Sequence, residues 1–323
     1  MKVRNNRGIA LIVVILAICA VVPVVIDLQR TVRGGAYESL NTADRINLNY
    51  MAHSGFNIAQ AVIMTQEEKP FTSLMDRWAN LGKILDPNEV LFPTGKVRIT
   101  VEDELGKIPL NMLVSGKKIN GDLRGLLMRL LCLPEFGLTQ ERAEEIVAAM
   151  IDWIDADEEV SPGGAESSYY RSLSVPYDAK NAPLDDLYEL LMVKGVTHEL
   201  FYGNPNRLGL KDLLTLHGTG KININTAPIT IIRALAKEVT IDLAREMDLY
   251  RRNEFNDLSD VMWYKNIKGM AEVSISRDLI TTKSNVFRIV SEASLERMKF
   301  RIIGTVERDG TKRPKLLAYR WER

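Results

Sequence analysis

Acidic side chains are concentrated in one segment in the middle of the chain. Eight Asp and Glu residues and no Lys or Arg lie within residues 143–170. Asp155 follows Asp152 by three residues, Asp157 follows Asp155 by two, and Glu166 follows Asp155 by eleven. Carboxylates at alternating positions followed by a Glu are typical of loops that bind calcium, since clustered acids repel each other until a hard cation neutralises them. We therefore predict a calcium site with ligands among Asp152, Asp155, Asp157 and Glu166.

The predicted site departs from the EF-hand loop. Val160 stands where that loop requires glycine, and Glu159 is long for its position. The spacing therefore favours an irregular calcium loop over an EF-hand. Magnesium is less favoured because it keeps more water and fewer protein ligands. The alternative is a solvated acidic loop without a metal.

Residues for catalysis are few. His53, His198 and His217 are far apart and have no metal-ligand spacing, and the chain has no glycine-rich phosphate loop and no nucleophile elbow. The paired carboxylates all lie in the acidic segment, where a cation explains them better than acid–base chemistry. We expect that the protein is not an enzyme and has no catalytic residues.

Composition excludes several other classes. The chain has 323 residues, with 42 Lys and Arg against 42 Asp and Glu. Such a balance argues against a basic nucleic-acid binder, and 46% hydrophobic residues argue against a disordered acidic chain. Two cysteines cannot form a disulfide-dense secreted scaffold.

The N-terminus contains a predicted membrane span. Residues 9–26 carry no charge and consist mostly of Val, Ile, Leu and Ala, and at about 1.5 Å per residue this run just crosses a bilayer core. Lys2, Arg4 and Arg7 precede it without an acid, which predicts that the N-terminal end stays in the cytoplasm and the rest crosses the membrane.

An amphipathic helix is expected to continue the span through residues 27–66. Apolar residues recur at spacings of three and four, as on one face of a helix. They are Leu28, Val32, Ala36, Leu40, Ala43, Ala52, Phe56, Ala59 and Ile63.

The remaining chain predicts an α+β fold. Residues 96–102 alternate in polarity as a strand does, and strand-rich segments follow at 284–293, 300–307 and 315–321. The intervening residues 105–283 are mostly helical in pattern. We therefore expect a head formed by residues 67–104 and 284–323, with an antiparallel sheet interrupted by a helical insertion over 105–283.

The insertion contains an internal repeat. Residues 106–111 (GKIPLN) and 220–225 (GKININ) are similar, and each precedes a run of helices, which predicts two related units at roughly 105–200 and 218–283. The terminal Asn of each hexamer is expected to cap the next helix. The second unit resembles helix-hairpin-helix modules, some of which bind DNA through a glycine-rich hairpin. Its hairpin, residues 237–240, contains no glycine and one acid, so we expect no nucleic-acid partner.

The segment Arg7-Gly8-Ile9 resembles the cleavage site of type IV prepilins and type II secretion pseudopilins. Most pilins carry a glutamate at the fifth mature position, which is Val13 here. Together with the helical insertion, the Asn-Thr-Ala-Pro segment 225–228 and the acidic stretch, this departure resembles the general secretion pathway protein K family of minor pseudopilins. That resemblance also covers nearly the whole chain.

The resemblance implies a pilin-like fold, in which a long N-terminal transmembrane helix packs on the sheet and the insertion holds two helix-hairpin-helix or SAM-like units. It implies that a prepilin peptidase removes residues 1–8 by cutting between Gly8 and Ile9, and that the new N-terminus is methylated. It implies a single-pass inner-membrane protein with its head in the periplasm, structural calcium sites, and a place at the tip of the type II secretion pseudopilus. The expected partners are two smaller minor pseudopilins, packed on the helix face near Leu40–Ile63.

Three alternatives remain open. A minor pilin of a type IV pilus would have the same class of structure in another machine. A membrane-anchored helix-hairpin-helix DNA receptor would bind DNA with a steep salt dependence. A membrane-tethered hydrolase would need a convergent polar pocket.

Overall fold

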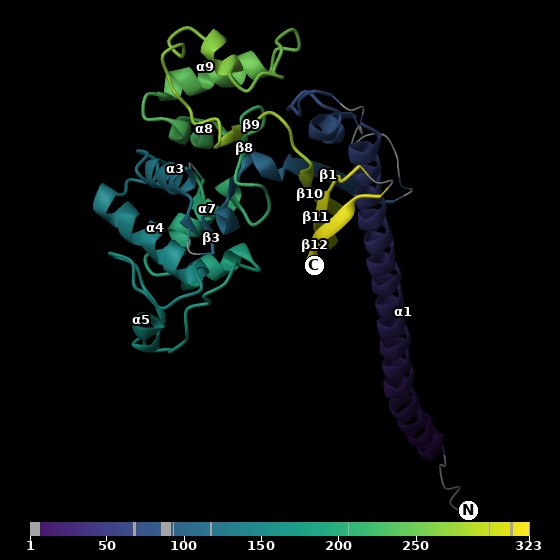
Figure 1. Ribbon diagram of the computed structural model, residues 1–323. Coiled ribbons are helices and arrows are strands. Elements are labelled where there is room, and N and C mark those ends of the chain that lie inside the picture. The colour runs from purple at the N-terminus through teal and green to yellow at the C-terminus, as the bar shows by residue number, and fades with distance from the viewer. Residues whose placement is uncertain are drawn as a thin grey trace, which may run out of the picture.

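The chain folds as a long helix, a four-stranded antiparallel sheet and a helical insertion, which confirms the predicted α+β class (Figure 1). The computed structural model describes residues 7–66, 69–84, 92, 94–116, 118–205, 207–296, 298–310 and 313–322. Residues 1–6 of the predicted leader, residues 1–8, lie outside the described residues.

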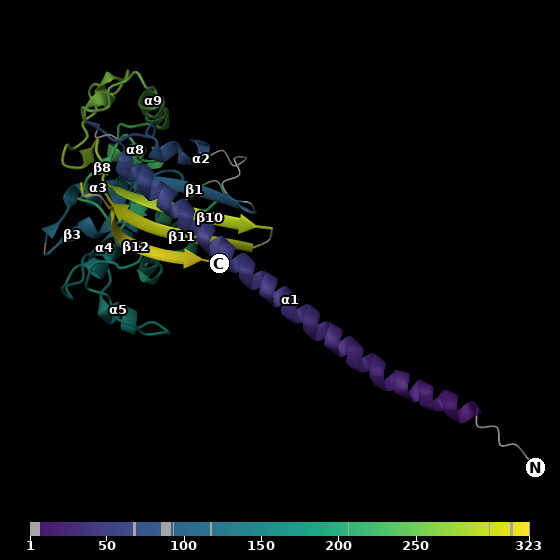
Figure 2. The ribbon, with the colours of Figure 1, turned by 90° about the vertical axis from the view of Figure 1, so that its right-hand side faces the viewer.

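One continuous helix, α1 (Arg7–Thr65), forms the N-terminal part of the molecule. Its 59 residues span roughly 90 Å at 1.5 Å per residue. The segment Ile9–Gly35 is long and apolar enough to cross a membrane: an 18-residue window within it has a mean hydropathy of 3.4, and none of that window is buried. Pro23 lies inside the helix without ending it. The predicted apolar span and its amphipathic continuation are therefore parts of a single helix, which Figure 2 shows extending far beyond the head.

The sheet has the strand order β1-β10-β11-β12, with all neighbours antiparallel. A row of paired residues crosses it: Val101 faces Ile289, Ile289 faces Gly304, and Gly304 faces Tyr319. β1 precedes the insertion and the other three strands follow it, so the split sheet is confirmed. Its strands are β1 (Lys96–Asp103), β10 (Val286–Leu295), β11 (Met298–Glu307) and β12 (Lys315–Glu322).

The second half of α1 packs against one face of this sheet. Ala52, Phe56, Ala59 and Ile63 are buried there at helical spacing. Gly304 lets the helix approach closely, because a Cβ at that position would lie 2.6 Å from the Phe56 ring. We expected partner subunits on this helix face, and this was wrong in part, since the chain's own sheet already covers its second half.

The insertion lies on the other side of the sheet from α1 (Figure 1). Its main helices pack in two pairs, α3 with α4 and α8 with α9, and α3 also contacts α8. The helices are α3 (Gly121–Leu131), α4 (Gln140–Ile154), α5 (Ser167–Arg171), α6 (His198–Tyr202), α7 (Leu210–Leu213), α8 (Ile229–Leu235) and α9 (Ile241–Arg251), while α2 (Leu81–Ile84) precedes the sheet. Two short hairpins also belong to it: β3 (Val114–Ser115) with β4 (Lys118–Ile119), and β5 (Gly203–Asn204) with β6 (Arg207–Leu208).

Each copy of the repeated hexamer is a short buried strand that leads into one helix pair. β2 (Ile108–Pro109) pairs in parallel with β7 (Leu214–Thr215), and β8 (Ile222–Asn223) pairs in parallel with β9 (Ile280–Thr281). The expected helix caps were wrong. Asn111 instead exchanges hydrogen bonds with the Leu184 backbone, and Asn225 accepts one from Trp263 Nε1 at 2.7 Å. Both amides thus connect distant segments, because their strands are buried beside other chain segments and not beside a free helix end.

Candidate metal centre

Helix α4 carries the first part of the predicted calcium site. The Thr139 hydroxyl caps its N-terminus by accepting a hydrogen bond from the Arg142 backbone N–H at 3.3 Å. Its last turn is buried, and Asp152 within it has an exposed fraction of 0%. The helix ends because Asp155 adopts an extended conformation. Asp152 and Asp155 are therefore presented on adjacent turns at the helix end.

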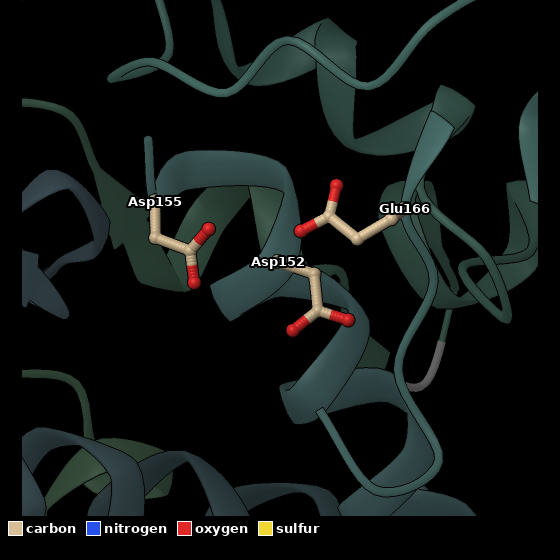
Figure 3. A group of neighbouring side chains, drawn as sticks. All are labelled: Asp152, Asp155 and Glu166. Atoms are coloured by element: carbon tan, nitrogen blue, oxygen red, sulfur yellow. The ribbon is translucent and has the colours of Figure 1, made fainter. Parts of the chain in front are cut away.

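Glu166 completes a cluster of three carboxylates. It lies in the loop before α5 and extends toward the last turn of α4 (Figure 3). One carboxylate oxygen from each of Asp152, Asp155 and Glu166 lies within 4.8 Å of the others. Asp152 and Glu166 are buried and Asp155 is half-buried. The cluster thus places three negative groups around one small space.

Several oxygens in this cluster have no protein partner. Both Glu166 oxygens and Asp155 Oδ1 are buried without a hydrogen bond in the described part of the chain. Burial, together with the charges of Asp152 and Asp155, raises the pKa of Glu166 to about 8. Burial and the charges of Asp157 and Asp152 raise the pKa of Asp155 to about 6. Unpaired buried oxygens of this kind are costly unless a cation or protons neutralise them.

The helix dipole makes a cation more favourable at this place. Asp152 and Asp155 lie at the negative end of α4, whose last turn contains no basic residue. The loop also packs closely against the carboxylates, since a Cβ at Gly164 would overlap the Asp152 carboxylate and only glycine fits there. Lys194 holds the loop from outside by donating to the carbonyl oxygens of Gly163 and Gly164, each at 3.0 Å.

The structure brings together three of the four predicted ligands. Asp157 lies next to the cluster but outside the group of close oxygens, and its Oδ1 accepts a hydrogen bond from the Glu159 N–H at 3.1 Å. Lys194 was missed by the sequence reasoning. It lies 30 residues from Gly164 in the chain, and no pattern near the acidic segment indicates its contact.

The donor set fits calcium best among common metals. Three carboxylates supply oxygen ligands only, and no His or Cys belongs to the group within the described ranges. Zinc prefers nitrogen and sulfur, whereas calcium accepts six to eight oxygens in irregular geometry.

The comparisons with known proteins agree with the fold and with one another. A family model described as type II secretion system (T2SS), protein K matches residues 106–202. Type II secretion system protein K of Pseudomonas aeruginosa is 25% identical over 313 residues, covering 94% of this chain and 90% of that protein. Its counterpart in Pectobacterium carotovorum is 42% identical over 71 residues, or 22% of each chain.

A solved structure shares the fold. A chain in the crystal structure of the GspK-GspI-GspJ complex from the type 2 secretion system of enterotoxigenic Escherichia coli matches with a TM-score of 0.71. The match covers 88% of this chain and 99% of that one at 21% identity. Taken with the split sheet and the two helix pairs, these matches show that the chain is similar over nearly its full length to type II secretion system protein K, whose family model matches residues 106–202 and whose fold it shares.

Proposed function

We propose that this protein is a minor pseudopilin that is made as a precursor, cut between Gly8 and Ile9, and methylated on Ile9. The apolar half of α1 then holds the protein in the inner membrane with its head in the periplasm. Assembly draws this helix out of the membrane and places the protein at the tip of the pseudopilus. Its role there is structural, in the assembly that exports proteins across the outer membrane.

The division of α1 into two halves carries this proposal. Residues Ile9–Gly35 are apolar and exposed, whereas positions from Leu48 to Ile63 are buried against the sheet. A helix of this kind can stay in lipid or pack among similar helices, while its other half carries the head. Basic residues before the span favour the orientation with the head outside the cytoplasm.

Two features favour the tip over the shaft. The insertion makes the head much broader than the sheet and helix alone (Figure 1). Such a head leaves little room for further copies along a helical shaft. Val13 at the fifth mature position offers no carboxylate to the terminal amine of a subunit above it. Both features suit a terminal subunit, which contacts neighbours only on the side toward the base of the filament.

We also propose that the partners are other minor pseudopilins. The solved chain of the same fold comes from a complex of three proteins. Because the sheet covers the second half of one α1 face, partners would contact other parts of the helix. Ile46 and Tyr50 are 51% and 69% exposed and offer apolar surface beside the head.

The second proposal concerns the carboxylate cluster, which we infer holds a structural calcium ion through Asp152, Asp155 and Glu166. The buried oxygens without partners support it. A bound calcium would supply positive charge and order the loop between α4 and α5. Helix α4 fixes the positions of Asp152 and Asp155, and Lys194 holds the loop in place through its hydrogen bonds.

Mass spectrometry of the mature N-terminus tests the first proposal. The expected species begins with a methylated Ile9, and the Gly8→Leu variant should keep its leader. An intact Met1 in the wild-type protein, or cleavage beyond Ile26, would refute processing at this position.

Isothermal titration calorimetry, in which calcium is added to the full chain in detergent, tests the second proposal. Calcium should release or absorb heat with one saturable site and raise the melting temperature, with a smaller effect from magnesium. If calcium produces no heat of binding and no rise in melting temperature, the proposed calcium site is refuted. The pseudopilin assignment is unaffected by that result.

A further inference from the structure

A groove of about 610 Å³ lies between the two helix pairs of the insertion. Its walls are α3, the start of α4, the end of α8 and the hairpin that leads to α9. It is separate from the carboxylate cluster, since Glu144 in the groove precedes Asp152 by eight residues, or about 12 Å along α4. The elements that form it lie on the side of the sheet away from α1 (Figure 1).

The floor of the groove contains two glycines of α3. Gly121, Gly125, Met128 and Cys132 follow one another along α3 at intervals of four, three and four. A Cβ at Gly121 would meet no atom within 4 Å, while one at Gly125 would lie 3.2 Å from Arg129 Nη1. Glycine inside a helix costs about 1 kcal/mol relative to alanine. Arg129 accounts for the glycine at position 125, whereas no neighbouring atom of the described chain requires glycine at position 121, where the helix surface is open to an approach from outside.

The rim of the groove carries unpaired positive charge. Arg129 and Arg233 are engaged, Arg129 with the carbonyl oxygens of Ala234 and Leu235 and Arg233 with Glu135. Arg124 and Lys237 make no ion pair within the residues that the structure describes. Glu144 is the single acid that lines the groove.

We propose that this groove binds an acidic amphipathic α-helix of another protein. Small residues of that helix would lie against the glycines of α3, where the two backbones can approach closely. Its larger apolar side chains would contact the half-buried Met128 and Leu133, and carboxylates on its flanks would pair with Arg124 and Lys237. An amphipathic helix laid into an apolar groove is a recurring mode of peptide recognition. The size of the groove suits a few such side chains, since ligand sites commonly enclose 300–1,000 Å³.

Nucleic acid fits this groove less well. Two free cations are few for a phosphate backbone, whose binders neutralise many phosphates. The hairpin between α8 and α9 contains Glu238 and no glycine, so it lacks a phosphate cradle. The half-buried apolar side chains of Met128 and Leu133 also suit side chains better than phosphates. Nucleic acid is therefore the competing outcome in the test.

Fluorescence anisotropy of a labelled helical peptide provides the test. The protein is the full chain in detergent with Cys19→Ser, which leaves Cys132 as the single thiol. The probe is a stapled peptide with Ala and Leu on one face and Glu on both flanks. The matched probe has Lys in place of every Glu, and a third probe is a labelled DNA duplex. We expect the Glu peptide to bind at least tenfold more tightly than the Lys peptide and to slow maleimide labelling of Cys132.

Two variants locate the binding. Gly125→Leu fills the floor and should weaken binding at least tenfold; because the new side chain must displace Arg129, its melting temperature is measured beside that of the wild type. Arg124→Glu should weaken it by a similar factor and reduce its salt dependence. Arg245→Glu on α9 makes the same charge change outside the groove and should leave binding unchanged. The proposal is overturned if no peptide binds, if the Glu and Lys peptides bind alike, if Gly125→Leu binds as the wild type does, or if the duplex binds more tightly than the Glu peptide.

Discussion

At the scale of single residues, the carboxylate cluster destabilises the head when no cation neutralises it. Three carboxylates share a small space, and burial raises the pKa of two of them well above their usual values. Such groups are tolerated where binding repays their cost, and pKa shifts of this size cluster at functional sites. The stability of this loop should therefore depend on both calcium and pH.

Replacing Glu166 with Gln should reverse the calcium response. Glu166→Gln removes one ligand and one repelling charge, so the metal-free protein should melt at a higher temperature than the wild type at pH 8. Added calcium should then raise the melting temperature little or not at all. Differential scanning fluorimetry with and without calcium measures both effects. Glu159→Gln is the matched control, since this exposed acid of the same loop lies outside the close group. An equal response of both variants to calcium would contradict the assignment of Glu166.

The pH dependence follows from the same groups. Because the folded pKa of Glu166 is about 8 and its unfolded value is near 4.5, the metal-free folded state holds a proton that the unfolded chain has lost. Stability of the metal-free protein should therefore fall as pH rises from about 5 to 8. Calcium displaces the proton, so its affinity should rise over the same interval. Thermal unfolding at a series of pH values with a chelator measures the fall, and Glu166→Gln should flatten it.

At the scale of elements, local patterns predict most of the secondary structure. Alternating polarity located β1 and the three later strands, and the apolar run located the first half of α1, since each pattern repeats over many residues. Long-range contacts were harder to predict. Asn111 and Asn225 were expected to cap helices, yet both bind segments far away in sequence. The carboxylate cluster was predicted only in part, because long-range contacts also decide which acids belong to it. Spacing along one helix brings Asp152 near Asp155, while the path of the loop decides that Glu166 approaches and Asp157 does not.

The contact between α1 and the sheet should depend strongly on Phe56. Its side chain is 4% exposed and packs against Gly304 and the ring of Tyr319, at a centroid distance of 5.9 Å. Phe56→Ala should lower the free energy of unfolding by about 3–5 kcal/mol, as truncation of buried aromatic residues does. Asn57→Ala, on the exposed neighbouring position, should change it little. Chemical denaturation of both variants in detergent provides the comparison, and similar values for the two would show that α1 does not depend on this contact.

At the scale of the whole molecule, the chain crosses between sheet and insertion twice, and one buried acid joins both crossings. Asp103 at the end of β1 accepts hydrogen bonds from Asn223 Nδ2 at 2.9 Å and Thr226 Oγ1 at 2.6 Å, both in the second helical unit. It also accepts bonds from the Leu105 N–H and from the hydroxyl of Ser284, just before β10. The carboxylate thereby connects the first crossing, the insertion and the second crossing. At the filament tip that we propose, a broad head would have to keep a fixed orientation, and this residue is placed to maintain it.

Asp103→Asn should loosen the insertion from the sheet without unfolding either part. The amide keeps the shape of the side chain but turns one acceptor oxygen into a donor, so two of the four buried donors lose their acceptor. We expect a loss of about 1–3 kcal/mol, the usual cost of unsatisfied buried polar groups. Hydrogen exchange should then rise at residues 103–107 and 280–286, while the buried positions of α4 and β11 stay protected. Asp122→Asn is the control, because this exposed acid accepts a hydrogen bond from Ser276 of its own insertion and lies away from both crossings. If exchange rises uniformly over the head, Asp103 supports the entire fold; if it does not rise at either crossing, other contacts hold the insertion in place.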